Sequence, residues 1–161
     1  MDLVTRKYPY YPTVPVATGK QPGTEWFVMA CRRRWNFSNL GTWVVRDMRG
    51  KPGQKSVHSS GAACDLGFNG ASASTIQQAW DWFMTYTKEL GIVEAHWYEA
   101  PKTKFGIGYR CSRGEGKAGV IRWTATNNGG KGGAWFHIEL DPHMATSEDA
   151  IKAAWKALPR P

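Results

Sequence analysis

One segment, residues 75–90, constrains the fold of this chain more than any other part of the sequence. Six of its residues recur at helical spacing and would share one face of a helix; they are Ile76, Ala79, Trp80, Phe83, Thr87 and Leu90. Ser74 can cap the start of this helix, Gln77 completes a capping box, and Gly91 stands where the helix would end. The stripe predicts a helix packed against a core and does not indicate a cofactor site.

Short runs of β-branched and aromatic residues lie on both sides of that helix and predict strands. These runs are residues 42–46, 92–98, 119–126 and 134–140. A second helix is expected over residues 147–158, beginning at Thr146 or Ser147 and ending at Pro159. The apolar run 25–31 is too short to distinguish strand from helix. The mixture predicts the α+β class: a small antiparallel sheet with a central helix and a C-terminal helix.

The 161 residues are enough for one domain. Residues 1–24 carry prolines too often for a helix or a central strand, so we expect an extended arm, with a flexible tail as the alternative. Residues 25–161 would then form the compact domain. With 42% hydrophobic and 21% charged residues, wholesale disorder is excluded. No apolar run approaches the roughly 18 residues of a membrane span, and the first residues do not resemble a secretory signal.

The charge of the chain favours polyanionic partners. Lys and Arg number 21 against 13 Asp and Glu, which gives a net charge of +8. Nucleic acid, an anionic membrane surface and an acidic cell wall would all suit that charge. The basic residues are scattered along the chain and no recognition-helix spacing is present, which argues against nucleic acid. That class stays open as an alternative because Arg32, Arg33, Arg34 and Trp35 could follow a phosphate backbone. Three cysteines are too few for a disulfide framework and are expected to be reduced.

Two of the four histidines and one aspartate suggest a metal site. Only small residues and one cysteine separate His58 from Asp65, so the backbone there can bend and pack closely. An imidazole and a carboxylate brought together in this way are two of the three protein ligands of a catalytic zinc site, which leaves a fourth position for water. His137, in an aromatic strand beside a glycine-rich loop, is the best candidate for the third ligand. His96 in a strand and His143 in a turn have ordinary structural explanations.

These residues carry a resemblance to a known family. Ser56, His58, Gly61, Ala63 and Asp65 match the S-x-H-x-x-G-x-A-x-D signature of the D-Ala-D-Ala carboxypeptidase family of zinc peptidases. That family includes the VanX and VanY enzymes and the phage L-alanyl-D-glutamate endopeptidases. Residues 135–139 resemble its second histidine motif, and the resemblance covers about residues 25–142. It implies that His58, Asp65 and His137 bind zinc in a cleft on the sheet.

The resemblance leaves the catalytic acid open. Many members carry Glu or Asp three residues before the last histidine, where this chain has Ala134. Glu139 would point the same way as His137 on a strand and could serve as the base, or it could orient a ligand. Glu94 or Glu99, on another strand, could also reach the site.

Substrate contacts follow from the same comparison. Family members hold the substrate carboxylate with an arginine before the first motif, and Arg46 and Arg49 both stand in that interval. Ser56, which opens the motif, is assigned to substrate binding with them.

The resemblance predicts a zinc-dependent peptidase that hydrolyses peptidoglycan stem peptides, of the D,D-carboxypeptidase or the L,D- or D,D-endopeptidase type. We expect a monomer, encoded by a phage as an endolysin or a virion-associated lysin, that stays in the host cytoplasm until lysis and acts at the anionic cell wall. A catalytically weak wall-binding or virion structural module on the same fold is one alternative. A basic nucleic-acid-binding protein is the other.

Overall fold

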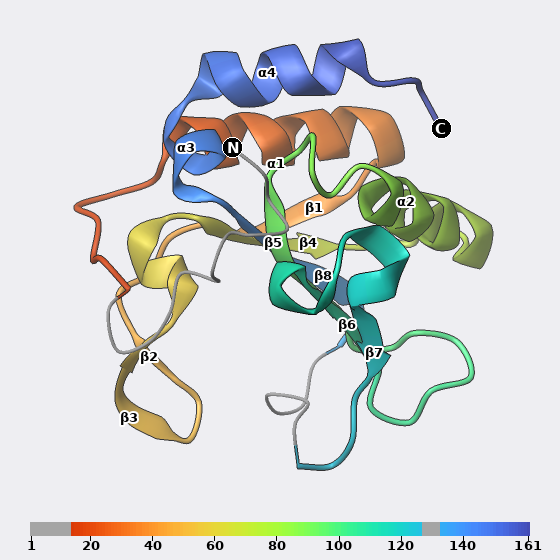
Figure 1. Cartoon of the computed structure of the whole chain (residues 1–161), viewed down its shortest axis with the longest axis horizontal. Helices are drawn as coiled ribbons and strands as arrows, with labels where there is room; N and C mark the ends of the chain where they lie inside the picture. The colour runs from red at the N-terminus through yellow and green to blue at the C-terminus, as the bar shows by residue number, and fades with distance from the viewer. Residues whose placement is uncertain (1–13, 127–132) are drawn as a thin grey trace.

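The structure is a computed structural model that describes residues 14–126 and 133–161 (Figure 1). These residues form an α+β fold with a six-stranded antiparallel sheet, a separate hairpin and four α-helices, which confirms the predicted class. The helices are α1 (Pro22–Trp35), α2 (Ala73–Thr85), α3 (Pro142–Thr146) and α4 (Glu148–Ala157). Three short 3-10 helices are η2 (Val57–Ser60), η3 (Cys111–Arg113) and η4 (Gly116–Gly119).

The sheet brings distant segments into register. Its order is β1-β4-β8-β5-β6-β7, and β2 and β3 form the hairpin. The strands are β1 (Ser38–Gly41), β2 (Asp47–Met48), β3 (Lys51–Lys55), β4 (Ala63–Gly67), β5 (Ile92–Trp97), β6 (Ile107–Arg110), β7 (Val120–Arg122) and β8 (Trp135–Leu140). Because β8 lies between β4 and β5, His137 is opposite Asp65 on one side and opposite His96 on the other.

Alternation along the strands separates a core face from a polar face. On β8, Phe136, Ile138 and Leu140 are fully buried on the side that the helices cover. His137 and Glu139 alternate with them and therefore point to the other side. Figure 1 shows α1 and α4 lying side by side above the sheet, with α2 next to them.

An aromatic cluster fills the space between these helices and the sheet. The Trp35 ring lies 5.2–5.9 Å, centroid to centroid, from four other rings. These belong to Phe37, Trp82, Phe83 and Trp155. Most of the packings are edge-to-face, the arrangement that aromatic quadrupoles favour. The tryptophans near α1, α2 and α4 are therefore core residues.

Helix α1 settles the ambiguous run 25–31 and begins inside the segment expected to be an arm. Pro22 occupies the first turn of α1, where a missing N–H costs nothing and the fixed φ suits a helix. The helix ends at Asn36, which takes the left-handed conformation with φ 58°. The proline-rich composition therefore did not exclude a helix over residues 22–24. Residues 1–13 of the expected arm lie outside the described residues.

The central helix is displaced from its predicted bounds. Ser72, and not Ser74, is the N-cap, and its Oγ accepts the Thr75 N–H at 3.1 Å. The helix ends at Thr85, and residues 86–91 continue as turns. Thr87 is buried there because its Oγ1 accepts the Gly116 N–H at 3.1 Å. Of the predicted stripe, Ala79, Trp80 and Phe83 are buried on the helix as expected, whereas Thr87 and Leu90 are buried beyond its end.

Residues 42–46 were predicted as a strand and are not one. Their backbone groups bond to η2 instead of to a neighbouring strand. The Val44 N–H donates to the His58 carbonyl at 3.3 Å, and the Ser59 hydroxyl donates to the carbonyls of Val44 and Arg46. Val44 and Val45 are exposed, so their β-branched side chains found no sheet to pack against. Residues 42–46 instead hold η2 in position through these hydrogen bonds.

The other predicted elements are largely confirmed. Strands β5 and β8 match the expected runs to within one residue, whereas β7 is shorter than the run 119–126. Helix α4 begins after Ser147, whose Oγ accepts the Ala150 N–H at 3.2 Å, and ends before Pro159. Cys31, Cys64 and Cys111 are free and buried.

Within the described part of the chain, no helix is long and apolar enough to cross a bilayer.

Candidate metal centre

The first motif builds a short helix that holds His58 in place. The Ser56 hydroxyl accepts the His58 N–H at 3.4 Å at the start of η2. Gly61 ends η2 in the left-handed conformation, φ 73°, and its N–H donates to the His58 carbonyl at 3.1 Å. The Gly61 carbonyl in turn accepts from Thr24 Oγ1 at 2.7 Å. Ser56 and Gly61 therefore have local structural reasons to stand two residues before and three after the histidine.

Gly61 is also needed for space. A Cβ at this position would lie 2.6 Å from Gln21 Cγ, which no side chain tolerates without movement. Ala63 follows on β4, fully buried and opposite Glu139, on the same face of the sheet as Asp65. A larger side chain at Ala63 would press against Glu139, so the small residue leaves room beside the site.

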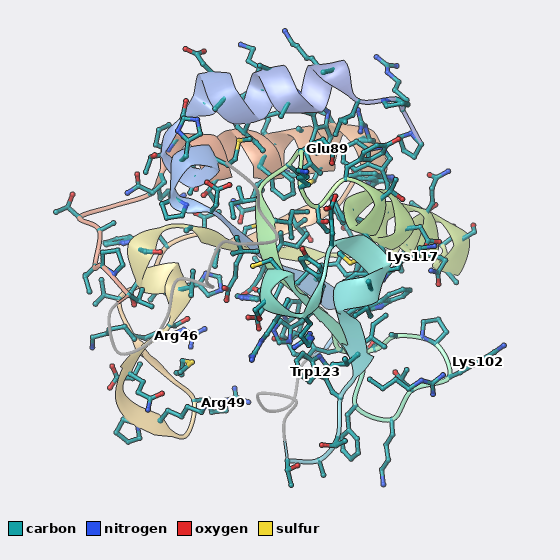
Figure 2. All side chains as sticks on the ribbon, viewed as in Figure 1. Arg46, Arg49, Glu89, Lys102, Lys117 and Trp123 are labelled. Atoms are coloured by element: carbon teal, nitrogen blue, oxygen red, sulfur yellow. The ribbon has the colours of Figure 1, made fainter. Side chains whose placement is uncertain are left out.

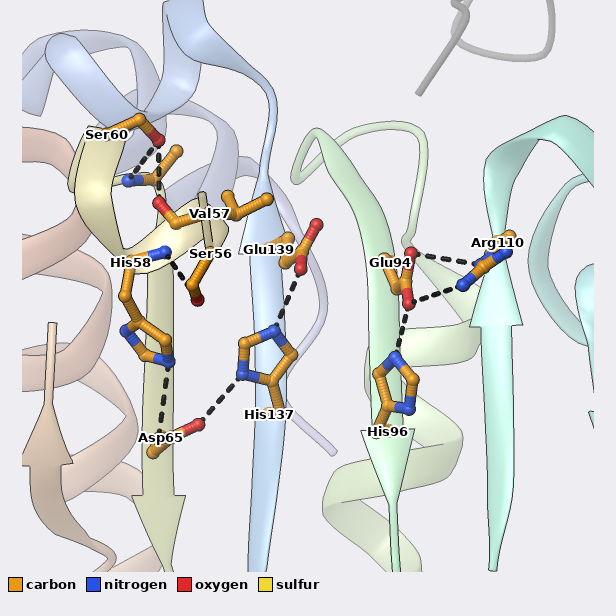
Figure 3. A network of polar contacts seen from close by, with 11 residues as sticks. Ser56, Val57, His58, Ser60, Asp65, Glu94, His96, Arg110, His137 and Glu139 are labelled. Carbon is orange, nitrogen blue, oxygen red and sulfur yellow. Dashed lines mark hydrogen bonds and ion pairs between the residues drawn. The ribbon is translucent and has the colours of Figure 1, made fainter. Parts of the chain in front are cut away.

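Three side chains converge where η2, β4 and β8 meet (Figure 3). His58 Nε2 is 3.3 Å from Asp65 Oδ2, and His137 Nδ1 is 2.9 Å from Asp65 Oδ1. The two imidazole rings pack edge to face with centroids 5.1 Å apart. One ligand atom from each of the three residues lies within 4.8 Å of the others, so the group could hold a metal ion.

The polar atoms of His58 fit such an ion. His58 is buried; its Nδ1 has no hydrogen-bond partner among the described residues, and its Nε2 has only the 3.3 Å contact with Asp65 Oδ2. A buried ring nitrogen without a partner is unfavourable, since an unmade hydrogen bond of this kind costs about 1–3 kcal/mol. A metal ion would supply the missing partner, because neutral imidazole is the commonest metal ligand in proteins. The Asp65 side chain is 24% exposed, which leaves an approach from solvent.

The second histidine is held between two carboxylates. While Nδ1 of His137 faces Asp65, Nε2 lies 2.9 Å from Glu139 Oε1. If Nδ1 is the ligand atom, Nε2–H donates to Glu139, which fixes both the tautomer and the ring orientation. The second oxygen of Glu139, Oε2, is buried and has no partner among the described residues. Glu139 therefore lies on the far side of the His137 ring from Asp65.

Electrostatics in this row of residues favour a cation at its centre. Burial alone would raise the pKa of Asp65, but hydrogen bonds with His137 and His58 outweigh it and hold that pKa well below its usual range. Burial alone would lower the pKa of His137, but hydrogen bonds to Asp65 and Glu139 raise it well above its ordinary value. Burial and the neighbouring Glu94 carboxylate raise the pKa of Glu139. A metal ion would take the place of the proton that these carboxylates otherwise hold on His137.

A second polar cluster adjoins the first across β5 and β6. His96 Nε2 contacts Glu94 Oε1, and Arg110 Nε donates to Glu94 Oε2 at 3.1 Å. Although burial acts to raise the pKa of Glu94, the nearby His96 and Arg110 lower it overall. The His96 ring stacks on Trp123 with centroids 5.0 Å apart and meets the His137 ring edge to face at 5.6 Å. The His96 ring therefore packs against the candidate metal centre, which is formed by His58, Asp65 and His137.

The sequence interpretation missed this cluster. His96 was assigned an ordinary place in a strand, and neither Arg110 nor Trp123 was singled out. The signal was the alternation of Glu94 and His96, which puts both side chains on one face of a strand. Its meaning depended on which strand lay alongside, and only the sheet order shows that it is β8.

The residues predicted to bind substrate or to act as the acid lie at different distances from the candidate metal centre. Ser56 lies next to His58, but its hydroxyl caps η2. Arg46 and Arg49 are exposed, in or just before the β2–β3 hairpin, which leads directly into η2 (Figure 2). Glu99 is exposed in the turn after β5, whereas the other two candidate acids, Glu94 and Glu139, are buried.

Comparisons with family models, with curated proteins and with solved structures find no match for this chain. The fold and the site define an α+β protein with a partly buried His-Asp-His group that could hold a metal ion.

Proposed function

We propose that this protein is a zinc-dependent peptidase that hydrolyses the stem peptides of bacterial peptidoglycan. The observation that carries the proposal is the convergence of His58, Asp65 and His137 within 4.8 Å. The same three residues are the ligands that the sequence motifs predict. Two imidazoles and one carboxylate form the ligand set of a catalytic zinc site with one open position. The net charge of +8 suits an anionic wall.

Each residue of the centre has a role in this proposal. His58, Asp65 and His137 would hold the ion, and Glu139 would orient His137 by accepting its Nε2–H. A zinc ion in this place would supply Lewis-acid chemistry, polarising a carbonyl and lowering the pKa of water. The exposed guanidinium groups of Arg46 and Arg49 are the proposed contacts for a substrate carboxylate, to which arginine binds in bidentate fashion.

A group that moves a proton is also required, and Glu139 is the first choice. Both oxygens of Glu94 are engaged by His96 and Arg110. Glu139 keeps one oxygen, Oε2, without a partner among the described residues, and burial and the Glu94 carboxylate raise the pKa of its carboxyl, which makes it the better candidate of the two. Glu139 would thereby replace the acidic residue that the resemblance expects at Ala134.

The deciding experiment measures bound metal and peptidoglycan cleavage on the same preparations. The parent chain should bind about one zinc ion and release new amino groups from purified peptidoglycan. His58→Ala should lose both the metal and the cleavage. His143→Ala is the matched control, because His143 is exposed on α3 and lies outside the centre. A parent chain that binds no zinc at neutral pH would contradict the proposal.

Two other outcomes would select the alternatives. Metal and wall binding without release of amino groups would indicate a wall-binding or virion structural module. Strongly salt-dependent binding to single-stranded DNA, with no binding to peptidoglycan, would indicate a nucleic-acid-binding protein. Iron should be measured beside zinc, because two histidines and one carboxylate also form the usual ligand set of non-haem Fe(II) oxygenases.

A further inference from the structure

A groove with a volume of about 510 Å³ lies between α2, the loop from β5 to β6, and strand β7. The apolar part of its lining includes Trp80, Trp97, Ile107 and Val120. Trp97 packs against Trp80 with ring centroids 5.7 Å apart. The groove is thus a separate feature from the metal centre, and none of the residues proposed there lines it.

The groove also lies on the other face of the sheet. Side chains alternate along β5, so Glu94 and His96 point toward the metal centre while Trp97 points toward the helices. Trp97 accordingly packs on Phe136 of the core face, at 5.5 Å between ring centroids. A ligand in the groove would not contact His58, Asp65 or His137.

Cations from three different elements line the groove. They are Lys102 from the β5–β6 loop, Lys117 from η4 and Arg122 from β7. Figure 2 shows Lys102 and Lys117 on the side of the molecule that carries α2, away from the β2–β3 hairpin. Arg122 Nη1 donates to the Lys102 carbonyl at 3.2 Å, which ties β7 to the loop.

Little negative charge offsets these cations. Among the described residues that line the groove, Asp81 is the single acidic one, and its Oδ1 lies 3.4 Å from Lys117 Nζ. Both side chains of this pair are largely exposed, 73% for Lys117 and 44% for Asp81, so the pair is weak and easily exchanged for another partner. Three cations against one carboxylate leave the lining with a net charge of +2.

One of the residues that line the groove, Trp97, carries an unused donor. Trp97 is buried, and its Nε1–H has no hydrogen-bond partner among the described residues. An indole N–H can only donate, and a buried donor without an acceptor is unfavourable. An acceptor-rich ligand, or a water that it holds, would satisfy this group.

We propose that this groove binds an extended chain of closely spaced anionic groups, phosphate or carboxylate. The cations stand on separate elements around one depression, which suits several linked anions better than one small ion. The apolar lining would pack against the uncharged part of the chain, and the Trp97 indole would be the donor beneath it. This binding does not depend on the peptidase activity.

The test measures binding by calorimetry at low salt, with inorganic polyphosphate and poly-L-glutamate as probes. Lys102→Glu/Arg122→Glu should weaken binding by roughly tenfold or more, since exposed ion pairs contribute up to about 1 kcal/mol each and reversed charges repel. The paired control is Lys152→Glu/Lys156→Glu, which changes the net charge equally on α4. Binding to the control should stay within about twofold of the parent, because charges beyond the groove act only at long range.

A spectroscopic measurement locates the ligand independently of the variants. The indole N–H resonance of Trp97 should shift on binding, whereas that of Trp35, another buried indole without a partner, should not. The difference in affinity between polyphosphate and poly-L-glutamate shows which of the two anionic groups the groove prefers. Absence of binding to both probes, equal weakening in the control, or an unchanged Trp97 resonance would overturn the proposal. His58→Ala should bind as the parent does, so a failure here leaves the peptidase proposal untouched.

Discussion

Asp65 on β4 stands directly opposite His137 on β8, and Asp65 Oδ1 meets His137 Nδ1 at 2.9 Å although 72 residues separate them in the sequence. The antiparallel register places both side chains on the polar face of the sheet. Helix η2 then adds His58 from the loop that precedes β4. The metal centre therefore depends on one strand pairing and one short helix, and each can be tested separately.

Glu139→Gln should retain the metal and lose most of the activity. The amide keeps an oxygen that can accept the His137 Nε2–H, but it cannot take up or release a proton. We expect cleavage of peptidoglycan to fall by roughly 10² to 10⁴-fold, the usual contribution of general acid–base catalysis. Bound zinc and released amino groups are measured together. Full remaining activity would remove Glu139 from the reaction, and Glu94→Gln and Glu99→Gln would be examined next.

Metal binding should stabilise the fold through Asp65. Adding zinc to the chelator-treated protein should raise the midpoint of thermal unfolding, since a ligand at 100 times its Kd contributes about 2.7 kcal/mol. Asp65→Asn keeps the size of the side chain but removes its charge, and it should abolish most of this increase. Zinc that stabilises the variant as much as the parent would place the metal elsewhere.

The free energy of unfolding of the metal-free protein should depend on pH through the pair formed by Asp65 and His137. The raised pKa of His137 means that its contribution is complete below about pH 6.5, the unfolded value, and is lost as pH rises through the folded pKa. The lowered pKa of Asp65 means that its contribution is present above about pH 4 and is lost as pH falls through the folded pKa.

Urea unfolding of the metal-free protein at a series of pH values tests whether stability falls on both the acid and the alkaline side as predicted. His137→Gln should flatten the alkaline side of the profile. Zinc affinity should change in the opposite sense and increase with pH, because the metal must displace the proton on His137. An affinity independent of pH between 6 and 9 would show that His137 is not a ligand.

Gly61→Ala should destabilise the protein more than Gly70→Ala. Both glycines have φ 73°, but a Cβ on Gly70 would meet nothing within 4 Å, whereas one on Gly61 would lie 2.6 Å from Gln21 Cγ. The shared left-handed conformation costs about 1 kcal/mol in each. Overpacking adds roughly 1–3 kcal/mol at Gly61 alone. Urea unfolding measures both, and equal losses would show that Gln21 moves aside freely.

Gly61→Ala should also weaken zinc binding, since Gly61 ends the helix that carries His58. Gly70 lies in the turn between β4 and α2, outside the metal centre, so Gly70→Ala should bind zinc as the parent does. Zinc affinity measured on the folded variants separates this local effect from the loss of stability.

Local patterns predicted some elements well and others poorly, for identifiable reasons. Strand β8 was predicted closely from its run of β-branched and aromatic residues, and helix α4 because its capping residue and the proline that follows it agree. Residues 42–46 had the composition of a strand, but their backbone groups bond to η2 instead of to a strand. Pro22 was taken as a sign of an arm, although a proline in the first turn of a helix is compatible with it. In both cases the chain around the segment decided its conformation.

The order of residues along the chain determined the chemistry of the candidate ligands. Two histidines and an aspartate, with a serine and a glycine at spacings that cap and end a short helix, are local properties, and so they can be read without coordinates. Tertiary structure alone decided which side chains meet. The strand order placed β8 between β4 and β5, so His137 gained Asp65 on one side and His96 on the other. Strand pairing is non-local, since it depends on packing of the whole apolar face against the helices, and no short motif encodes it.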